Sequence, residues 1–208
     1  MQKMILALAL LITMEAGAQN DKYTQVMLKN IALLDSAKSI DALQSLAGTF
    51  ERIGDAEKTK WLPYYYAALA QTWVGWNPET KDKDANAAKI KSYLDKAEAI
   101  EKNGETYAVE NMMYTQQMLM DPQSRWATNG KDANIALQTG LKLDPNNPRL
   151  YYLQGESLFG TPAQFGGGKD KAKPVFEKAL ALYKAAQPQP LAPKWGQKQV
   201  EEKLALCQ

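Results

Sequence analysis

Apolar residues recur every three or four positions along most of the chain, which is the spacing of one face of a helix. Helix-breaking dipeptides separate the periodic segments: Asn77-Pro78, Asp121-Pro122, Asp144-Pro145, Asn147-Pro148 and Thr161-Pro162. The pattern predicts helices over residues 21–35, 39–54, 61–76, 84–102, 105–120, 131–143, 148–160, 170–185 and 194–206. Val and Ile are sparse, and no alternation of strand length stands out. We therefore expect an all-α protein.

The N-terminus has the pattern of a signal peptide. Lys3 gives a short positive segment, residues 4–14 are an uninterrupted apolar run, and residues 16–18 supply the small side chains that a signal peptidase requires. The run is well short of the about 20 apolar residues that span a bilayer. We expect cleavage after Ala18 and a periplasmic or secreted protein without a membrane span.

A spacing typical of helical repeats follows in the second half of the chain. The segment Ala133-x3-Leu137-x2-Gly140-x4-Pro145 matches the second helix of a tetratricopeptide (TPR) repeat. Counting on in the same register places Gly155 at the small position of the next first helix. A small residue is needed there because two helices cross closely, with a large side chain beside them.

On these motifs the chain resembles TPR proteins over roughly residues 61–186. The segments WLPYYYAALA and NPRLYYLQGESLFGTPAQFGGGKDKAKPVFEKA also resemble a group of secreted TPR-like proteins of Gram-negative bacteria without an assigned activity. The resemblance implies a right-handed α-solenoid of helical hairpins with long loops inside the hairpins and a C-terminal capping helix. The expected divisions are a signal peptide (1–18), an N-terminal hairpin (19–60), three TPR-like hairpins (61–186), and a linker with the capping helix (187–208).

The repeats are longer than a standard TPR, and the extra length lies in loops inside the hairpins. These loops cover residues 77–83, 121–130 and 161–169. In a stacked array such loops emerge on one edge and often form the binding face. Trp126 and Phe165 are large apolar side chains in polar loops, with Arg125 and Lys169 nearby. Either the two rings fold back over the core, which general frequencies favour, or they contact a partner.

Other candidate contacts follow from the resemblance. In TPR proteins the first helix of each hairpin faces a concave groove, which places Tyr152, Glu156 and Phe159 in that groove. Tyr65 is a further groove candidate, whereas Tyr66 is expected in the core.

The glycines at 166–168 precede Lys169 but do not make a phosphate-binding loop, because Asp170 replaces the Ser or Thr and no strand comes before them. We interpret them as a turn, with Asp170 capping the next helix and Pro174 in its first turn. An anion at this helix N-terminus stays open as an alternative.

Composition narrows the chemistry. Lys and Arg number 25 against 23 Asp and Glu, which gives no reason to expect nucleic acid. The chain has no His and a single Cys, Cys207, so His-based catalysis, an intrachain disulfide and a thiolate metal cluster are excluded. No pair of carboxylates has a spacing that argues for acid–base catalysis.

These observations favour a non-enzymatic scaffold that binds a protein or peptide partner in the cell envelope, without a cofactor or metal. The alternative is a carbohydrate- or small-ligand-binding module that uses the loop aromatics. The candidate partner-binding residues are Tyr65, Arg125, Trp126, Tyr152, Glu156, Phe159, Phe165 and Lys169.

Overall fold

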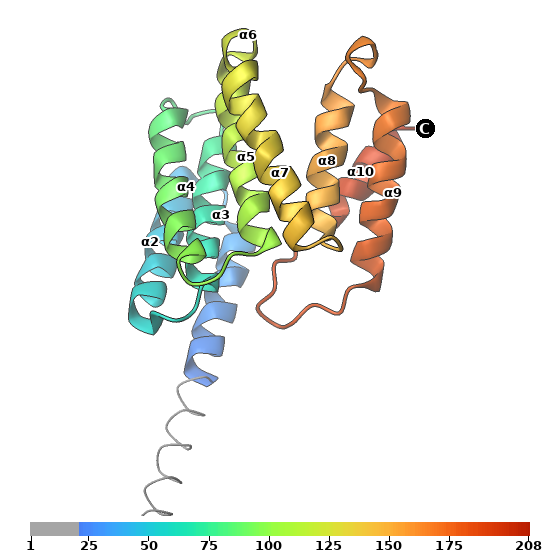
Figure 1. Cartoon of the computed structure of the whole chain (residues 1–208). Helices are drawn as coiled ribbons and strands as arrows, with labels where there is room; N and C mark the ends of the chain where they lie inside the picture. Colours follow the sequence, from blue (N-terminus) through green and yellow to red (C-terminus); the bar gives the residue numbers. More distant parts are fainter. Residues whose placement is uncertain (1–20) are drawn as a thin grey trace, which may run out of the picture.

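Helices that pack against their neighbours in the sequence form the described part of the protein, which in the computed structural model is residues 21–208 (Figure 1). Residues 21–36 are helical. The following helices are α2 (Ile40–Glu57), α3 (Leu62–Trp76), α4 (Lys83–Glu98), α5 (Gly104–Met120), α6 (Pro122–Arg125), α7 (Lys131–Leu143), α8 (Pro148–Gly160), α9 (Lys169–Ala185) and α10 (Gln197–Leu206). No strand occurs within residues 21–208, so the expected all-α class is confirmed. The predicted signal peptide (1–18) lies outside the described residues.

Polar side chains begin several helices where the sequence predicted a boundary. The side chains of Ser39, Asp82, Asn103 and Asn147 each accept a hydrogen bond from a backbone N–H of the first turn that follows. Such caps satisfy N–H groups that have no partner inside the helix. The predicted and observed boundaries therefore agree closely at these four starts.

The segment 121–130 is helical, which corrects its prediction as a loop. The Asp121 side chain accepts a hydrogen bond from the backbone N–H of Ser124 at 3.4 Å, and Pro122 occupies the first position of α6. A π-helical turn, Trp126–Gly130, then connects α6 to α7. The cap at Asp121 and the proline favour a helix start here rather than a break.

Two apolar clusters make up the core. The larger runs from the first described helix to α8 and includes Met27, Phe50 and Val109, all fully buried. The smaller joins α9 and α10 around Phe176 and Val200. Helix α10 therefore packs against α9, and its role as the capping helix of a solenoid stays a prediction.

Helices α8 and α9 cross closely at the small position that the repeat spacing predicts. A Cβ atom added to Gly155 would lie 2.4 Å from the Phe176 ring, so only glycine fits there. A Cβ on Gly140 would similarly lie 2.8 Å from Leu150.

The glycine turn before α9 also differs in detail from its prediction. Gly166 and Gly168 have φ angles of 86° and 98°, which glycine adopts without steric strain. Helix α9 begins at Lys169 with Gly168 before it, and no side chain caps it. The expected cap at Asp170 is wrong because the cap position is Gly168, two residues earlier, and Pro174 consequently lies inside the helix.

Candidate functional site

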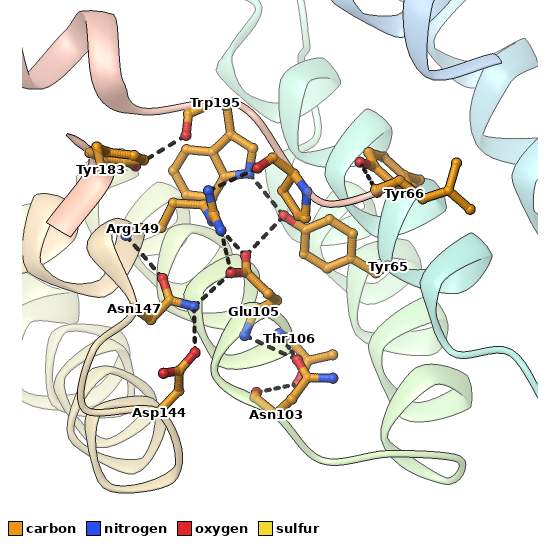
Figure 2. A network of polar contacts seen from close by, with 12 residues as sticks. Tyr65, Tyr66, Asn103, Glu105, Thr106, Asp144, Asn147, Arg149, Tyr183 and Trp195 are labelled. Carbon is orange, nitrogen blue, oxygen red and sulfur yellow. Dashed lines mark hydrogen bonds and ion pairs between the residues drawn. The ribbon is translucent and has the colours of Figure 1, made fainter. Parts of the chain in front are cut away.

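A buried polar network occupies the centre of the helical array, between α3, α5, α8 and the C-terminal segment (Figure 2). The Nε and Nη2 atoms of Arg149 donate hydrogen bonds to the two carboxylate oxygens of Glu105 at 2.7 and 2.6 Å. The Arg149 and Glu105 side chains are 11% and 13% exposed. Asn147 Nδ2 donates a further bond to Glu105 at 2.6 Å. This bidentate geometry fixes the start of α8 against the start of α5.

Trp195 closes the network from the C-terminal side. Its indole Nε1 donates a 2.8 Å hydrogen bond to the Tyr65 hydroxyl, and its ring meets that of Tyr152 edge-on, with centroids 6.3 Å apart. Arg149 Nη1 donates to the carbonyl of Pro193 at 3.0 Å. In Figure 1 the chain leaves α9 and runs back toward the centre of the molecule before α10. The C-terminal segment therefore contacts Tyr65 and Tyr152, two of the residues that were expected to meet a partner.

Burial also fixes the protonation of this network. It raises the pKa of the Tyr65 hydroxyl well above its usual value, and the nearby Glu105 carboxylate adds to that rise. Burial alone would lower the pKa of Arg149, but the Glu105 carboxylate raises it above its usual value. Tyr65 therefore stays a neutral hydroxyl and Arg149 a cation at neutral pH, as a structural network requires.

Among the predicted groove residues Tyr65 is buried, whereas Tyr152, Glu156 and Phe159 are partly exposed. Tyr65 has no exposed surface, so its assignment to an open groove is wrong. Glu156 accepts a 2.9 Å hydrogen bond from Lys203 of α10, and the Lys203 ammonium lies 4.7 Å from the Phe159 ring. The C-terminal segment and α10 thus contact this face, which the repeat pattern alone did not indicate.

The loop candidates are exposed. Trp126 is 61% and Phe165 is 74% exposed, so the expectation that they fold back over the core is wrong. Trp126 lies against its own turn, since a Cβ on Gly130 would be 3.3 Å from its ring. Arg125 is engaged by Asp84, with two hydrogen bonds of 2.8 Å between them. Lys169 is exposed at the start of α9. These four residues are not brought into one enclosed site.

A cleft of about 470 Å³ lies between the helix over residues 21–36 and α2. It is lined by Lys22, Tyr23, Val26, Thr49, Arg52, Ile53, Ala56 and Glu57. Its volume falls within the about 300–1,000 Å³ that ligand pockets enclose. This cleft was not among the predicted sites. Its one signal in the sequence is that Lys22 and Val26 lie one helical turn apart and therefore share a face of the helix. We name it the N-terminal cleft.

A second cleft of about 310 Å³ lies beside the α3–α4 loop. It is lined by Ile40, Gln44, Gln71, Val74, Glu79, Thr80, Lys81, Asp82, Ala85, Asn86 and Lys89. Gln71 and Asn86 satisfy each other through a 2.6 Å hydrogen bond. Its lining has two acidic and two basic side chains, so it carries no net charge. We name it the α3–α4 cleft.

Among residues 21–208, no group of three or more His, Cys, Asp or Glu side chains could hold a metal ion. Cys207 is a free, partly buried thiol. No helix in the described part of the chain is both long and apolar enough to cross a membrane.

No protein-family model matches the chain, and no protein of curated function matches it. Among solved structures, the HusA haemophore from Porphyromonas gingivalis is similar to it, with 38% sequence identity and a TM-score of 0.82. The match covers 89% of this chain and 92% of HusA. The expectation of a scaffold for a protein or peptide partner is therefore wrong, because the matching protein is a haemophore. Membership of the TPR family stays a prediction.

Proposed function

The chain belongs to the family of the HusA haemophore, and on this basis we propose that it binds and carries a haem-type porphyrin. The observation that supports the proposal is the likeness of sequence and fold over almost the whole of both chains. A porphyrin carrier is a small-ligand-binding protein, the class that the sequence offered as the alternative to a scaffold. The protein would act as a carrier and not as an enzyme, and the predicted signal peptide supports a periplasmic or secreted location.

The composition indicates how such a ligand would be held. Because the chain has no His, the commonest protein ligand of haem iron is absent. A tyrosine ligates iron as the phenolate, and burial raises the pKa of Tyr23 to about 12, with Glu57 adding to the rise. We therefore propose that affinity comes mainly from the flat apolar macrocycle and its carboxylates, with little contribution from the metal.

The experiment is a titration of the chain from residue 19 onward with haemin, followed by the Soret absorbance and by quenching of tryptophan fluorescence. A saturable change at about one porphyrin per chain is expected. Metal-free protoporphyrin is expected to bind within about tenfold of haemin, since no His ligates the iron. Porphyrin titrations without any saturable change would overturn the proposal.

A glycan panel forms the second arm of this experiment, because the Trp126 and Phe165 side chains are exposed. Fluorescence quenching by a glycan but not by a porphyrin would replace the haem-carrier proposal with the carbohydrate-binding alternative. Flat glycan titrations beside a saturable porphyrin titration support the proposal.

A further inference from the structure

The N-terminal cleft combines an apolar floor with cationic walls. Val26, Ile53 and Ala56 contribute aliphatic surface, and the Tyr23 ring lies beneath them with 7% of its surface exposed. Lys22 stands on the first helix and Arg52 on α2, so the two cations come from the two walls. An apolar cleft with a few charged groups is the usual form of a site for a small amphipathic ligand.

Arg52 differs from the other arginines of the chain in having no acidic partner. Arg125 is paired with Asp84 and Arg149 with Glu105, whereas Arg52 forms no ion pair with any residue of the described chain. Its Nη2 donates a 2.9 Å hydrogen bond to Thr49 Oγ1, which directs the guanidinium along the cleft wall. A guanidinium in this position is suited to bidentate recognition of a carboxylate.

The Tyr23 ring also lines the cleft. The Lys60 ammonium lies over this ring, 5.4 Å from its centre. Glu57 is the one acidic residue of the lining, against two basic residues. The cleft therefore carries a net positive charge together with aliphatic surface.

Three other places fit a porphyrin less well. The α3–α4 cleft has about two-thirds of the volume, 310 against 470 Å³, and its charges cancel. On the central face, Trp195 already packs against Tyr65 and Tyr152. Trp126 and Phe165 are single, exposed rings on separate helical turns.

We propose that the N-terminal cleft is the porphyrin site, with the macrocycle against Val26, Ile53 and Ala56 and its carboxylates held by Lys22 and Arg52. This inference rests on the proposed function and adds to it the place and the chemistry of recognition. The ligand class is a flat apolar ring that bears carboxylates.

Four variants test the site by haemin and protoporphyrin titration. Arg52→Glu is expected to raise the Kd about tenfold or more, because an anion then faces the ligand carboxylate. Val26→Glu should also raise the Kd, because it places an anion in the apolar lining of the cleft. Val26 is 38% exposed, so the substitution should leave the fold intact. Glu57→Gln should lower the Kd, because it removes the only acidic group of the lining. Ala56→Phe should block binding by filling the cleft.

Matched controls carry the same changes elsewhere. Lys89→Glu reverses a charge in the α3–α4 cleft, and Leu33→Glu places an acid at a 47% exposed position of the same helix as Val26. Both controls are expected to bind porphyrin with a Kd within about twofold of the unmodified protein, as for exposed substitutions away from a site. Circular dichroism confirms that every variant is folded.

Paramagnetic broadening locates the ligand independently of the variants. Ferric haem should broaden the backbone amide signals of residues 22–26 and 49–57, and metal-free protoporphyrin should not. Unchanged affinity in Arg52→Glu and Val26→Glu, or broadening centred on other residues, overturns the assignment while the proposed function stands. No porphyrin binding by the unmodified protein would contradict the proposed function itself, and the site assignment with it.

Discussion

The indole Nε1 of Trp195 donates a 2.8 Å hydrogen bond to the hydroxyl of Tyr65, although the two residues are 130 positions apart in the sequence. This contact joins the C-terminal segment to α3 across the centre of the helical array (Figure 2). It lies on the face on which a TPR protein would hold a peptide.

Replacing Trp195 with Ala is expected to destabilise the protein by about 3 kcal/mol, because a large ring packed against Tyr152 is lost and Tyr65 loses a donor. Urea unfolding followed by circular dichroism measures the change. Trp126→Ala is the control, since this side chain is 61% exposed, and it should cost no more than about 0.5 kcal/mol. Equal stability of the two variants would show that the C-terminal segment does not hold the fold together.

Removing one partner of the Glu105–Arg149 pair is expected to lower the free energy of unfolding more than removing both partners. Glu105→Leu leaves the Arg149 cation buried, with 11% of its side chain exposed, and should destabilise by about 3–5 kcal/mol. The double variant Glu105→Leu, Arg149→Met should be more stable than either single variant, because no unpaired charge remains. Chemical unfolding of all four proteins gives the coupling energy, and additive effects would contradict the account.

Two glycines of α8 give a sharp comparison. Gly155→Ala places a Cβ 2.4 Å from the Phe176 ring, so it should push α8 from α9 and destabilise by about 1–3 kcal/mol. Gly160→Ala meets nothing within 4 Å and should be neutral or stabilising by up to about 1 kcal/mol through helix propensity. Thermal unfolding of both variants measures the difference. A Gly155→Ala protein as stable as Gly160→Ala would contradict the observed helix crossing.

Alkaline pH is expected to unfold the protein through its buried tyrosines. Burial raises the pKa of Tyr23 from 10.0 to about 12, and it raises that of Tyr65 as well. Since the folded pKa exceeds the unfolded value, this contribution to stability is complete below pH 10 and is lost as the pH rises through 12. Tyrosine ionisation, followed by ultraviolet absorbance, should occur together with loss of helical circular dichroism. Ionisation of Tyr23 and Tyr65 near pH 10 in a protein that keeps its helices would contradict this.

Much of the fold could be predicted from the sequence because its signals are local. Apolar periodicity, breakers such as Asp144-Pro145, and caps such as Asn103 act within a few residues, and the predicted and observed helices coincide closely. The close approach at Gly155 also follows from spacing alone. The helical turns after Asp121 could have been found from the cap and the following proline.

The candidate sites could not be predicted in the same way, because they depend on contacts between distant residues. Nothing near Tyr65 in the sequence indicates that Trp195 covers it. The N-terminal cleft is lined by Lys22 and Arg52 from two different helices, and the repeat spacing, which covers residues 61–186, does not extend to either of them. In the sequence Arg52 is one of three arginines and nothing distinguishes it. Only the structure shows that it has no acidic partner within residues 21–208.

Equilibrium dialysis of the unmodified protein against haemin and against metal-free protoporphyrin tests the central claim most directly. If the protein is a porphyrin carrier, both ligands are retained saturably, at one porphyrin per chain. Retention is weaker at high salt, because cationic side chains recognise the porphyrin carboxylates. Retention that rises without saturation, or no retention of either porphyrin, would contradict it.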